Sequence, residues 1–481
     1  MKRVFWIIAL LLLALALILG IRTTSFSAKT YEPLEQRVRA VAHPQVLARA
    51  MVFQTISHKP GMIDQEAFYG LHRFLAEQFP LADSLLQTRV IGDYSLLYHW
   101  RGTKSDLDPV ILMAHMDVVP VEYATRDQWD HPAFGGEMTS EHIYGRGALD
   151  DKGSLVAMLD AAENLLQAGF KPERDIYLCF GHDEEIGGAN GAELIRDYLK
   201  KSGVRAWLVL DEGGTLATGL IPGIEDTVAL IGTSEKGYVS LELSANIPGG
   251  HSSMPEEKNA LATINRALVS LEENPLPYRL SPPLQGFVQH IGPHLSGFKK
   301  MAFANTWLFK SLIFNAYRQT AAGAALIHTT QVPTIFNAGV KDNIVPYRAQ
   351  AVVNYRLLPG DTPEKILKRA RKIVADTLVK IRIHQDLAIA ASPVSAVDCD
   401  QFRKIASAIK SVNQSAIISP YLVLGATDAR HFYEIADHVY RFSPIPIDKK
   451  DLSRIHGVNE RVAIGAYQQA VDFYATLINS F

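Results

Sequence analysis

His115 and Asp117 are separated by one residue and follow an apolar run, residues 110–114, that is typical of a buried strand. Side chains two positions apart on an extended segment leave the sheet on the same side. This spacing therefore places an imidazole and a carboxylate together at a strand end, where open α/β sheets usually hold their sites. Taken alone, the pair fits a turn or capping role better than a site.

Three acidic clusters further along the chain strengthen the case for chemistry at this edge. They are Asp150-Asp151 at the end of a glycine-rich loop, Asp183-Glu184-Glu185 after the apolar run 176–180, and Asp211-Glu212 after the run 207–210. A late histidine, His456, lies in a loop. Carboxylates gathered at one sheet edge repel one another unless cations compensate them.

Two histidines with several carboxylates form a ligand set that suits zinc, or less selectively manganese or cobalt. The chemistry would be hydrolytic and Lewis-acidic. A carboxylate shared by two ions would set them ~3.5–4 Å apart and polarise both a water and a carbonyl group. Each cluster also has a simpler interpretation, as a helix N-cap or a solvated loop.

The order of elements predicts the scaffold for these residues. From Val110 onward, strand and helix patterns alternate, which favours an α/β domain with a mainly parallel sheet. After Gly237 the strands alternate apolar and polar residues, which predicts an inserted, smaller α+β domain. We expect an N-terminal segment over 1–25, a catalytic domain formed by 31–236 and 391–481, and the inserted lid or dimerisation domain over 237–390.

The N-terminus is predicted to lie outside the fold. Lys2 and Arg3 precede an apolar run, residues 4–21, which is about long enough to span a bilayer. The positive flank favours a cytoplasmic N-terminus with the remainder translocated. The run is either a retained membrane anchor or a cleaved signal peptide, and both place the catalytic domain outside the cytoplasm.

Composition excludes several other classes of function. The net charge of −2 over 481 residues provides no basic field for nucleic acid, and two cysteines exclude a cysteine-rich zinc site. The chain contains neither a phosphate-binding glycine loop nor the G-x-S-x-G motif of serine hydrolases. Residues 282–330 are harder to interpret. One interpretation is a helical insertion in the small domain. The other is an apolar lid that lies over an apolar substrate or beside the membrane.

Six motifs together resemble one known family. They are H-M-D-V-V-P, Y-G-R-G-A-L-D-D-K-G, D-E-E-I-G-G, L-D-E-G-G, G-G-H-S-S-x-P and I-H-G-V-N-E, in that order between about Leu112 and Val462. The set resembles the metallopeptidase family of aminoacylase, carnosinase, glutamate carboxypeptidase and carboxypeptidase S. Within that family, the sequence pattern is most similar to the branch of carboxypeptidase S and the N-fatty-acyl-amino-acid synthase/hydrolase.

The resemblance implies a dinuclear zinc site with two ions per subunit. His115 and Asp211 would hold one ion, Glu185 and His456 the other, and Asp150 would bridge them. Relatives use either acid at the third position, so Glu212 is the alternative to Asp211. Asp117 would orient His115, and Glu184 would be the general base that takes a proton from the metal-bound water and returns it to the leaving amine.

The resemblance also implies residues that contact the substrate. His251 would reach the oxygen of the tetrahedral intermediate, usually from a partner subunit, which implies a homodimer through the inserted domain. It could instead be a simple turn histidine. Four residues match positions near the substrate carboxylate: Asn343, Arg356, Thr427 and Arg430. An arginine is a good carboxylate anchor, although Arg356 could merely pair with a neighbour.

The resulting hypothesis is an anchored or exported zinc hydrolase that cleaves an amide bond next to a free carboxylate. The substrate would be a small peptide or an N-acyl amino acid. The branch resemblance and the apolar insertion favour bulky acyl groups, while a carboxypeptidase or dipeptidase without acyl preference is the alternative. A non-catalytic metal-binding module is a second class, but every expected catalytic position is occupied.

Overall fold

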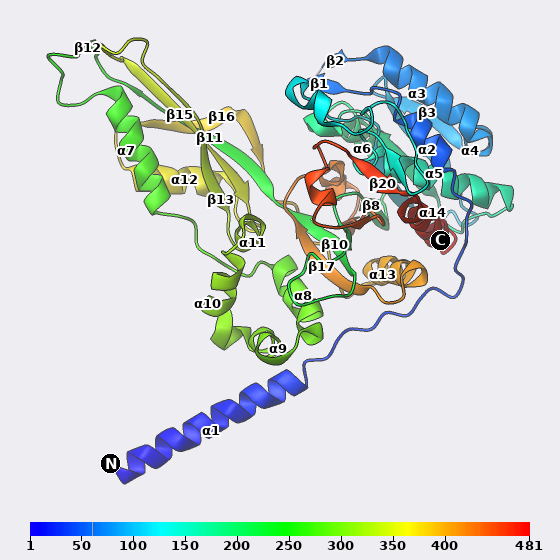
Figure 1. The fold of residues 1–481 in the computed structure, drawn as a ribbon, viewed down its shortest axis with the longest axis horizontal. Helices are drawn as coiled ribbons and strands as arrows, with labels where there is room; N and C mark the ends of the chain where they lie inside the picture. Colours follow the sequence, from blue (N-terminus) through cyan, green and yellow to red (C-terminus); the bar gives the residue numbers. More distant parts are fainter. Residues whose placement is uncertain (60) are drawn as a thin grey trace.

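The computed structural model describes residues 1–59 and 61–481. Among these residues, the main sheet has ten strands in the order β19-β9-β10-β18-β8-β5-β7-β4-β3, with β17 beside β10 (Figure 1). The strands are β3 (Gln87–Ile91), β4 (Ser95–Trp100), β5 (Val110–His115), β7 (Ile176–Gly181), β8 (Leu208–Asp211), β9 (Thr215–Ala217), β10 (Val228–Glu235), β17 (Ile417–Val423), β18 (Val439–Arg441) and β19 (Pro446–Ile447).

The centre of this sheet is parallel, and its flanks are mixed. β7, β5, β8 and β18 pair in parallel, whereas β3, β4 and β9 join by antiparallel pairing. Every residue of β5, β7 and β8 is buried, as expected for parallel strands covered on both faces. The predicted α/β class is confirmed, but the sheet as a whole is mixed, because its edges are built from local antiparallel pairs that the helix-and-strand alternation did not reveal.

Helices cover both faces of the sheet. On one face, α5 (Lys152–Gln167) packs with α13 (Asp400–Val412) and α14 (Ile464–Ile478) in the largest apolar cluster. On the other face, α6 (Ala192–Lys201) packs with the short η4 (Asp428–Glu434). The helices cover the two faces of the sheet, and loops surround the carboxyl ends of the parallel strands. Sheets of this kind position functional side chains at those ends.

A second, antiparallel sheet has the order β13-β15-β11-β16. Its strands are β11 (Gly237–Asn246), β13 (Thr330–Ala338), β15 (Arg348–Leu357) and β16 (Lys380–Ile389), and the helices α7 (Ala260–Glu273) and α12 (Pro363–Val374) pack against it. Val239, Leu241 and Leu243 are fully buried under these helices, as their alternation predicts. In Figure 1 this sheet extends away from the main sheet, and the short strand β12 (Gly250–His251) lies at its far tip.

Four helices lie between Pro282 and Ile327, and the first of them packs directly on β17 of the main sheet. They are α8 (Pro282–Ile291), α9 (Gly297–Ala304), α10 (Thr306–Tyr317) and α11 (Ala321–Ile327). Leu284, Phe287 and Phe314 share an apolar cluster with Val228 and Ile417 of the main sheet. Part of the apolar surface of this segment is therefore buried against β10 and β17 of the main sheet.

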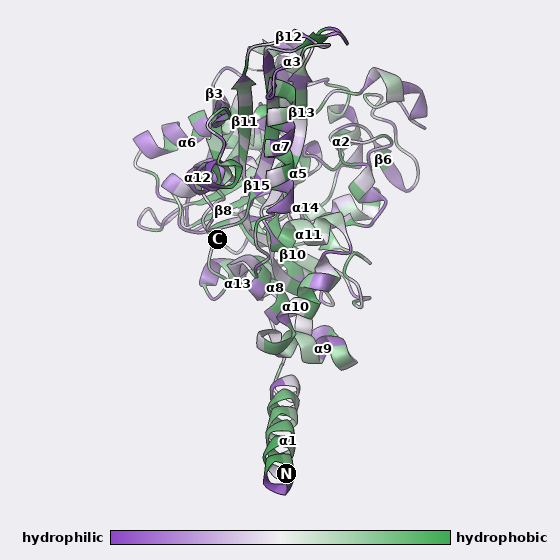
Figure 2. Cartoon of the chain, turned by 90° about the vertical axis from the view of Figure 1, so that its left-hand side faces the viewer, coloured by the Kyte–Doolittle hydropathy of each residue, from purple (hydrophilic) through white to green (hydrophobic). Residues whose placement is uncertain are grey.

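The N-terminal helix α1 (Lys2–Thr24) projects from the body next to α9, as Figures 1 and 2 both show. It is long and apolar enough to cross a membrane, and none of its most apolar window is buried. The remaining elements are α2 (Pro44–Ala50), β1 (Ser57–Lys59), β2 (Met62–Ile63), α3 (Gln65–Gln78), α4 (Pro80–Leu85), η1 (Tyr123–Gln128), β6 (His142–Tyr144), η2 (Glu184–Ile186), η3 (Gly292–His294), β14 (Ile344–Val345), η5 (Asp451–Ser453) and β20 (Arg461–Ala463).

Candidate metal centre

The acidic clusters meet at the carboxyl end of the parallel strands. His115 is the last residue of β5, and Glu184 and Glu185 form the short helix that follows β7. Asp150 precedes α5, Glu212 follows β8, and His456 follows η5. Because β7, β5 and β8 run in parallel side by side, their ends bring these residues together from distant parts of the chain.

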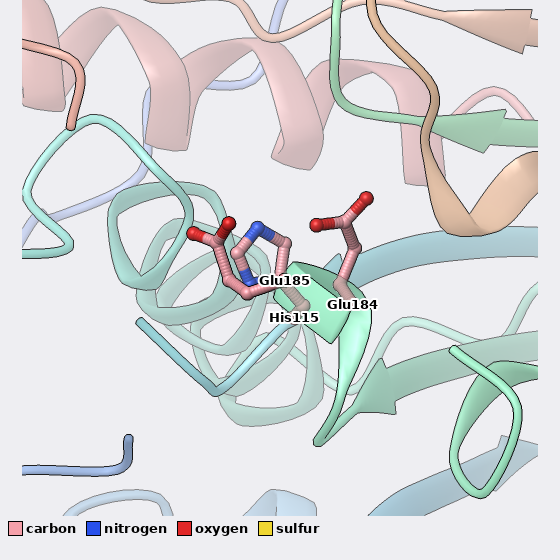
Figure 3. A group of neighbouring side chains, drawn as sticks. All are labelled: His115, Glu184 and Glu185. Atoms are coloured by element: carbon pink, nitrogen blue, oxygen red, sulfur yellow. The ribbon is translucent and has the colours of Figure 1, made fainter. Parts of the chain in front are cut away.

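Three overlapping groups have ligand atoms within 4.8 Å of one another. They are His115 with Glu184 and Glu185, His115 with Asp150 and Glu212, and Asp150 with Glu185 and His456. In the view of Figure 3 the ring of His115 lies between the carboxylates of Glu184 and Glu185. The groups overlap because His115, Asp150 and Glu185 each belong to two of them.

Asp150 lies between the two histidines. Its Oδ1 is 2.9 Å from His115 Nε2, and its Oδ2 is 3.0 Å from His456 Nε2. Burial would raise the pKa of Asp150, but these contacts outweigh it and lower that pKa. The contacts of His456 with Asp150 and Glu185 raise the pKa of His456 to about 10. Asp150 is thus an ionised carboxylate that offers one oxygen to each side.

Negative charge accumulates around this pair. Burial, followed by the neighbouring carboxylates Asp150 and Glu184, raises the pKa of Glu212 well above its usual range. Burial raises the pKa of Glu184 as well; His115 lowers it, whereas Asp428 and Glu185 raise it. Several carboxylates at this site oppose one another's ionisation, and two imidazoles lie among them. Carboxylate oxygens and imidazole nitrogens are ligands that bind divalent zinc.

Asp117 is buried behind the group and contacts two of its loops. The Nδ1 of His115 is 3.0 Å from the carbonyl oxygen of Asp117 and 3.4 Å from its carboxylate. The same carboxylate accepts backbone hydrogen bonds from Glu184 and Glu185, each at 3.1 Å. Asp117 therefore holds both the imidazole of His115 and the loop that carries the two glutamates.

The two acids after β8 have different surroundings. Asp211 is 3% exposed, and its Oδ2 accepts the backbone N–H of Ala429 at 2.7 Å. Glu212, by contrast, has a carboxylate oxygen within the group formed by His115 and Asp150. Successive side chains diverge at the strand end, so the geometry favours Glu212 for the position that the resemblance assigned to Asp211.

Glu460 is a positioning residue whose role the motifs did not predict, although it closes the I-H-G-V-N-E motif. Its carboxylate is fully buried and accepts backbone N–H bonds from Gly147, Leu149 and Asp150 at 3.1, 2.9 and 3.3 Å. It also binds the guanidinium of Arg146. A single buried acid in this way shapes the glycine-rich loop that presents Asp150.

The residues expected near a substrate carboxylate are dispersed. Arg430 donates to the carbonyl of Gly187 at 2.6 Å, beside the loop of the two glutamates. Thr427 is buried, and both its backbone N–H and its hydroxyl bind Glu235. The guanidinium of Arg356 lies 4.9 Å from the ring centroid of Tyr238. Of these three residues, Arg430 is the one that contacts the loop carrying Glu184 and Glu185.

His251 and Asn343 lie elsewhere, at the far tip of the second sheet. Both are exposed, and β12 pairs with β14 there. The ring of His251 contacts the Ser253 hydroxyl at 2.8 Å, and the carbonyl of Asn343 accepts the N–H of Ser252 at 3.2 Å. Within the described part of one chain, these two residues are not members of the metal-ligand groups.

A mixed α/β fold with a cluster of histidines and carboxylates at the ends of parallel strands is an arrangement suited to a metal-dependent hydrolase. The profile of Peptidase family M20/M25/M40 matches residues 111–480. The chain belongs to this family. It is therefore an enzyme, a metallopeptidase-type hydrolase of amide bonds, as predicted from its motifs.

Sequence relatives agree with this assignment, and a solved structure shares the fold. The chain is 38% identical to "Probable carboxypeptidase S-like 2" of Dictyostelium discoideum, over 91% of this chain and 84% of that protein. It is 36% identical to an N-fatty-acyl-amino acid synthase/hydrolase of Xenopus tropicalis, over 91% and 85%. The crystal structure of an M20 family metallo-carboxypeptidase from Sulfolobus solfataricus has the same fold, with a TM-score of 0.66, 20% identity, and 91% and 99% coverage.

Proposed function

We propose that this protein is a dinuclear zinc hydrolase that cleaves N-acyl amino acids at the amide bond next to the free carboxylate. The observation that carries the proposal is the set of three ligand groups, in which His115, Asp150 and Glu185 each belong to two groups. His115 and Glu212 would hold one ion, Glu185 and His456 the other, and Asp150 would lie between them. When bound, the ions would supply Lewis acidity toward the amide carbonyl and a water.

The chain's own residues account for proton transfer. The raised pKa of Glu184 suits a group that accepts a proton from the attacking water and then gives it to the leaving amine nitrogen. Asp117 fixes this glutamate through its backbone N–H, so the carboxylate stays free for the reaction. Arg430 is our choice for the substrate carboxylate, since its guanidinium lies at the same loop.

The acyl preference is supported by a hollow whose lining residues are connected to the metal group through their neighbours. A cavity of about 690 Å³ is lined mainly by apolar side chains, including Ile56, Pro120, Val121 and Phe134. Ile56 pairs with Val118, the residue after Asp117. Trp129, which also lines the hollow, contacts Arg146, and Arg146 binds the carbonyl of Gly457 next to His456. Two relatives of this chain are named for acyl-amino-acid and carboxypeptidase activities.

We further propose that His251 and Asn343 act on the site of a partner subunit in a homodimer. Their exposure at the tip of a projecting sheet supports this, because an exposed histidine there is available to a second copy. The domain division at residues 237 and 390, with 1–25 separate, stays a proposal, and within it residues 282–327 pack toward β10 and β17 of the main sheet. Helix α1 would anchor the protein, with the body outside the cytoplasm.

The substrate proposal is tested with the full chain, purified in detergent and loaded with zinc. Bound zinc is counted by elemental analysis, and hydrolysis is measured for dipeptides and for N-acyl amino acids of increasing chain length. We expect two zinc ions per chain and kcat/KM that rises with acyl length. Cleavage of dipeptides alone would contradict the acyl preference, and a zinc-free, inactive protein would contradict the metal centre.

A further inference from the structure

Carboxylates are missing from two stretches of the sequence that meet in space. Residues 1–31 contain no Asp or Glu, and neither do residues 274–341, between Glu273 and Asp342, although the whole chain has 50 acidic residues. The second stretch includes α8, α9, α10 and α11, and it carries cations such as Lys299, Lys300 and Lys310. Absence of acidic side chains removes repulsion from an anionic surface.

The two stretches are in contact at the base of the molecule. The guanidinium of Arg22 donates to the carbonyl of Ala304 at 3.3 Å, and the amide of Asn305 contacts the Thr23 hydroxyl at 3.3 Å. Arg22 is the first charged residue after the apolar run of α1. Figure 2 shows α9 and α10 between α1 and the rest of the body. If α1 spans a bilayer, these contacts place α9 and α10 at its surface.

The same helices expose large apolar side chains. Phe298 is 53% exposed, Trp307 54%, Leu308 42% and Leu312 47%. A hollow of about 680 Å³ between α1 and α10 is lined by Arg22 and Phe26 from one side and by Trp307 and Lys310 from the other. Contiguous exposed apolar residues mark an interaction site, and tryptophan is enriched at bilayer interfaces.

We propose that α9 and α10 form a docking surface for the anionic phospholipid bilayer that α1 spans. This basal surface is defined by six residues: Phe298, Lys299, Lys300, Trp307, Lys310 and Leu312. The apolar side chains enter the interfacial layer, and the lysines contact lipid phosphates. The body is thereby held in one orientation on the membrane. The inference rests on the anchoring role proposed above for α1.

The test measures quenching of Trp307 fluorescence in the full chain, reconstituted in vesicles that contain brominated lipids. The sequence has five tryptophans, so the signal of Trp307 is the difference between the wild type and W307F. With phosphatidylglycerol in the vesicles, we expect bromine near the headgroup end of the acyl chains to remove most of the Trp307 emission. Undiminished emission from Trp307 would overturn the proposal.

A matched pair of variants isolates the charge. The triple variant K299Q/K300Q/K310Q should lose most of the quenching gained from phosphatidylglycerol, because each lysine contributes about fivefold near an anionic surface. The control K365Q/K368Q/K372Q removes three exposed lysines from α12 and should quench like the wild type. Equal quenching in phosphatidylcholine alone, or equal loss in both variants, would overturn the role of the lysines in binding an anionic surface.

Alkaline carbonate extraction separates this proposal from the anchor itself. A chain that stays in the vesicles while Trp307 remains unquenched has its anchor and lacks the docking surface. A chain released by carbonate lacks the anchor, and headgroup-level quenching of Trp307 before extraction would still support docking.

Discussion

The metal centre and the tip of the inserted sheet carry residues that we assign to one reaction. Within one chain, however, the side chains at the metal centre are buried and held by hydrogen bonds, whereas those at the tip are exposed. At the metal centre, Asp117 is fully buried and fixes its neighbours by hydrogen bonds. At the tip, His251 and Asn343 are exposed and have local contacts within their own loop. The first region is preorganised by the fold, whereas the second is exposed, and our proposal assigns it to the site of a partner subunit.

The largest effect is expected at the preorganised region. Replacing Glu184 by Gln keeps the size of the side chain but removes its proton-accepting oxygen. We expect kcat to fall by about 10²–10⁴-fold, the usual contribution of a general base, with two zinc ions retained. Steady-state kinetics and elemental analysis check this. Activity near that of the wild type would contradict the role of Glu184.

A pair of variants in the same region tests whether Asp211 or Glu212 is the metal ligand. Glu212→Gln should lose one zinc ion per chain and more than the 10–100-fold in activity typical of an outer-shell residue. Asp211→Asn is the matched control and should keep both ions, because an amide oxygen can still accept the N–H of Ala429. Loss of an ion from the Asp211 variant alone would restore the ligand set that the resemblance implied.

The exposed tip is tested by mixing two inactive variants. His251→Ala alone should lower kcat by about 10²-fold, as the loss of an oxyanion donor does. Mixed one to one with Glu184→Gln, it should recover roughly a quarter of wild-type activity, because random C2 dimers give one intact site in half of the molecules.

No recovery in exchanged dimers would show that His251 acts within its own chain or not at all. Sedimentation of each variant provides the control that both still form dimers.

The smallest effect concerns the joint between the two regions. Lys236 links β10 to β11, and its ammonium group donates to the carbonyls of Ala325 and His328. Burial lowers the pKa of Lys236 from 10.5 to about 7. Between these pH values the unfolded chain binds more protons than the folded chain, so this residue makes stability rise with pH.

Thermal unfolding of the wild type and Lys236→Met across pH 7 to 9 measures this contribution. The Tm of the variant should rise less with pH than that of the wild type, because the variant lacks the titrating ammonium group. Parallel pH profiles would contradict the lowered pKa.

The sequence by itself determined the chemistry and the central scaffold. The runs before His115, Glu184 and Asp211 are wholly apolar, and burial on both faces demands such composition, so β5, β7 and β8 could be predicted. Motif order identified the family, and the apolar N-terminal run predicted a membrane-spanning segment. These features are local, or they are preserved as short patterns along the chain.

The tertiary structure decided which side chains converge. Neighbouring acids such as Asp211 and Glu212 have identical chemistry in the sequence, and only the direction of each side chain at the end of β8 separates them. The three backbone bonds of Glu460 and the packing of α8 on β17 depend on contacts between distant segments. The position of His251 likewise follows from the projection of the inserted sheet. Sequence patterns specify what a residue can do, and long-range packing specifies what it meets.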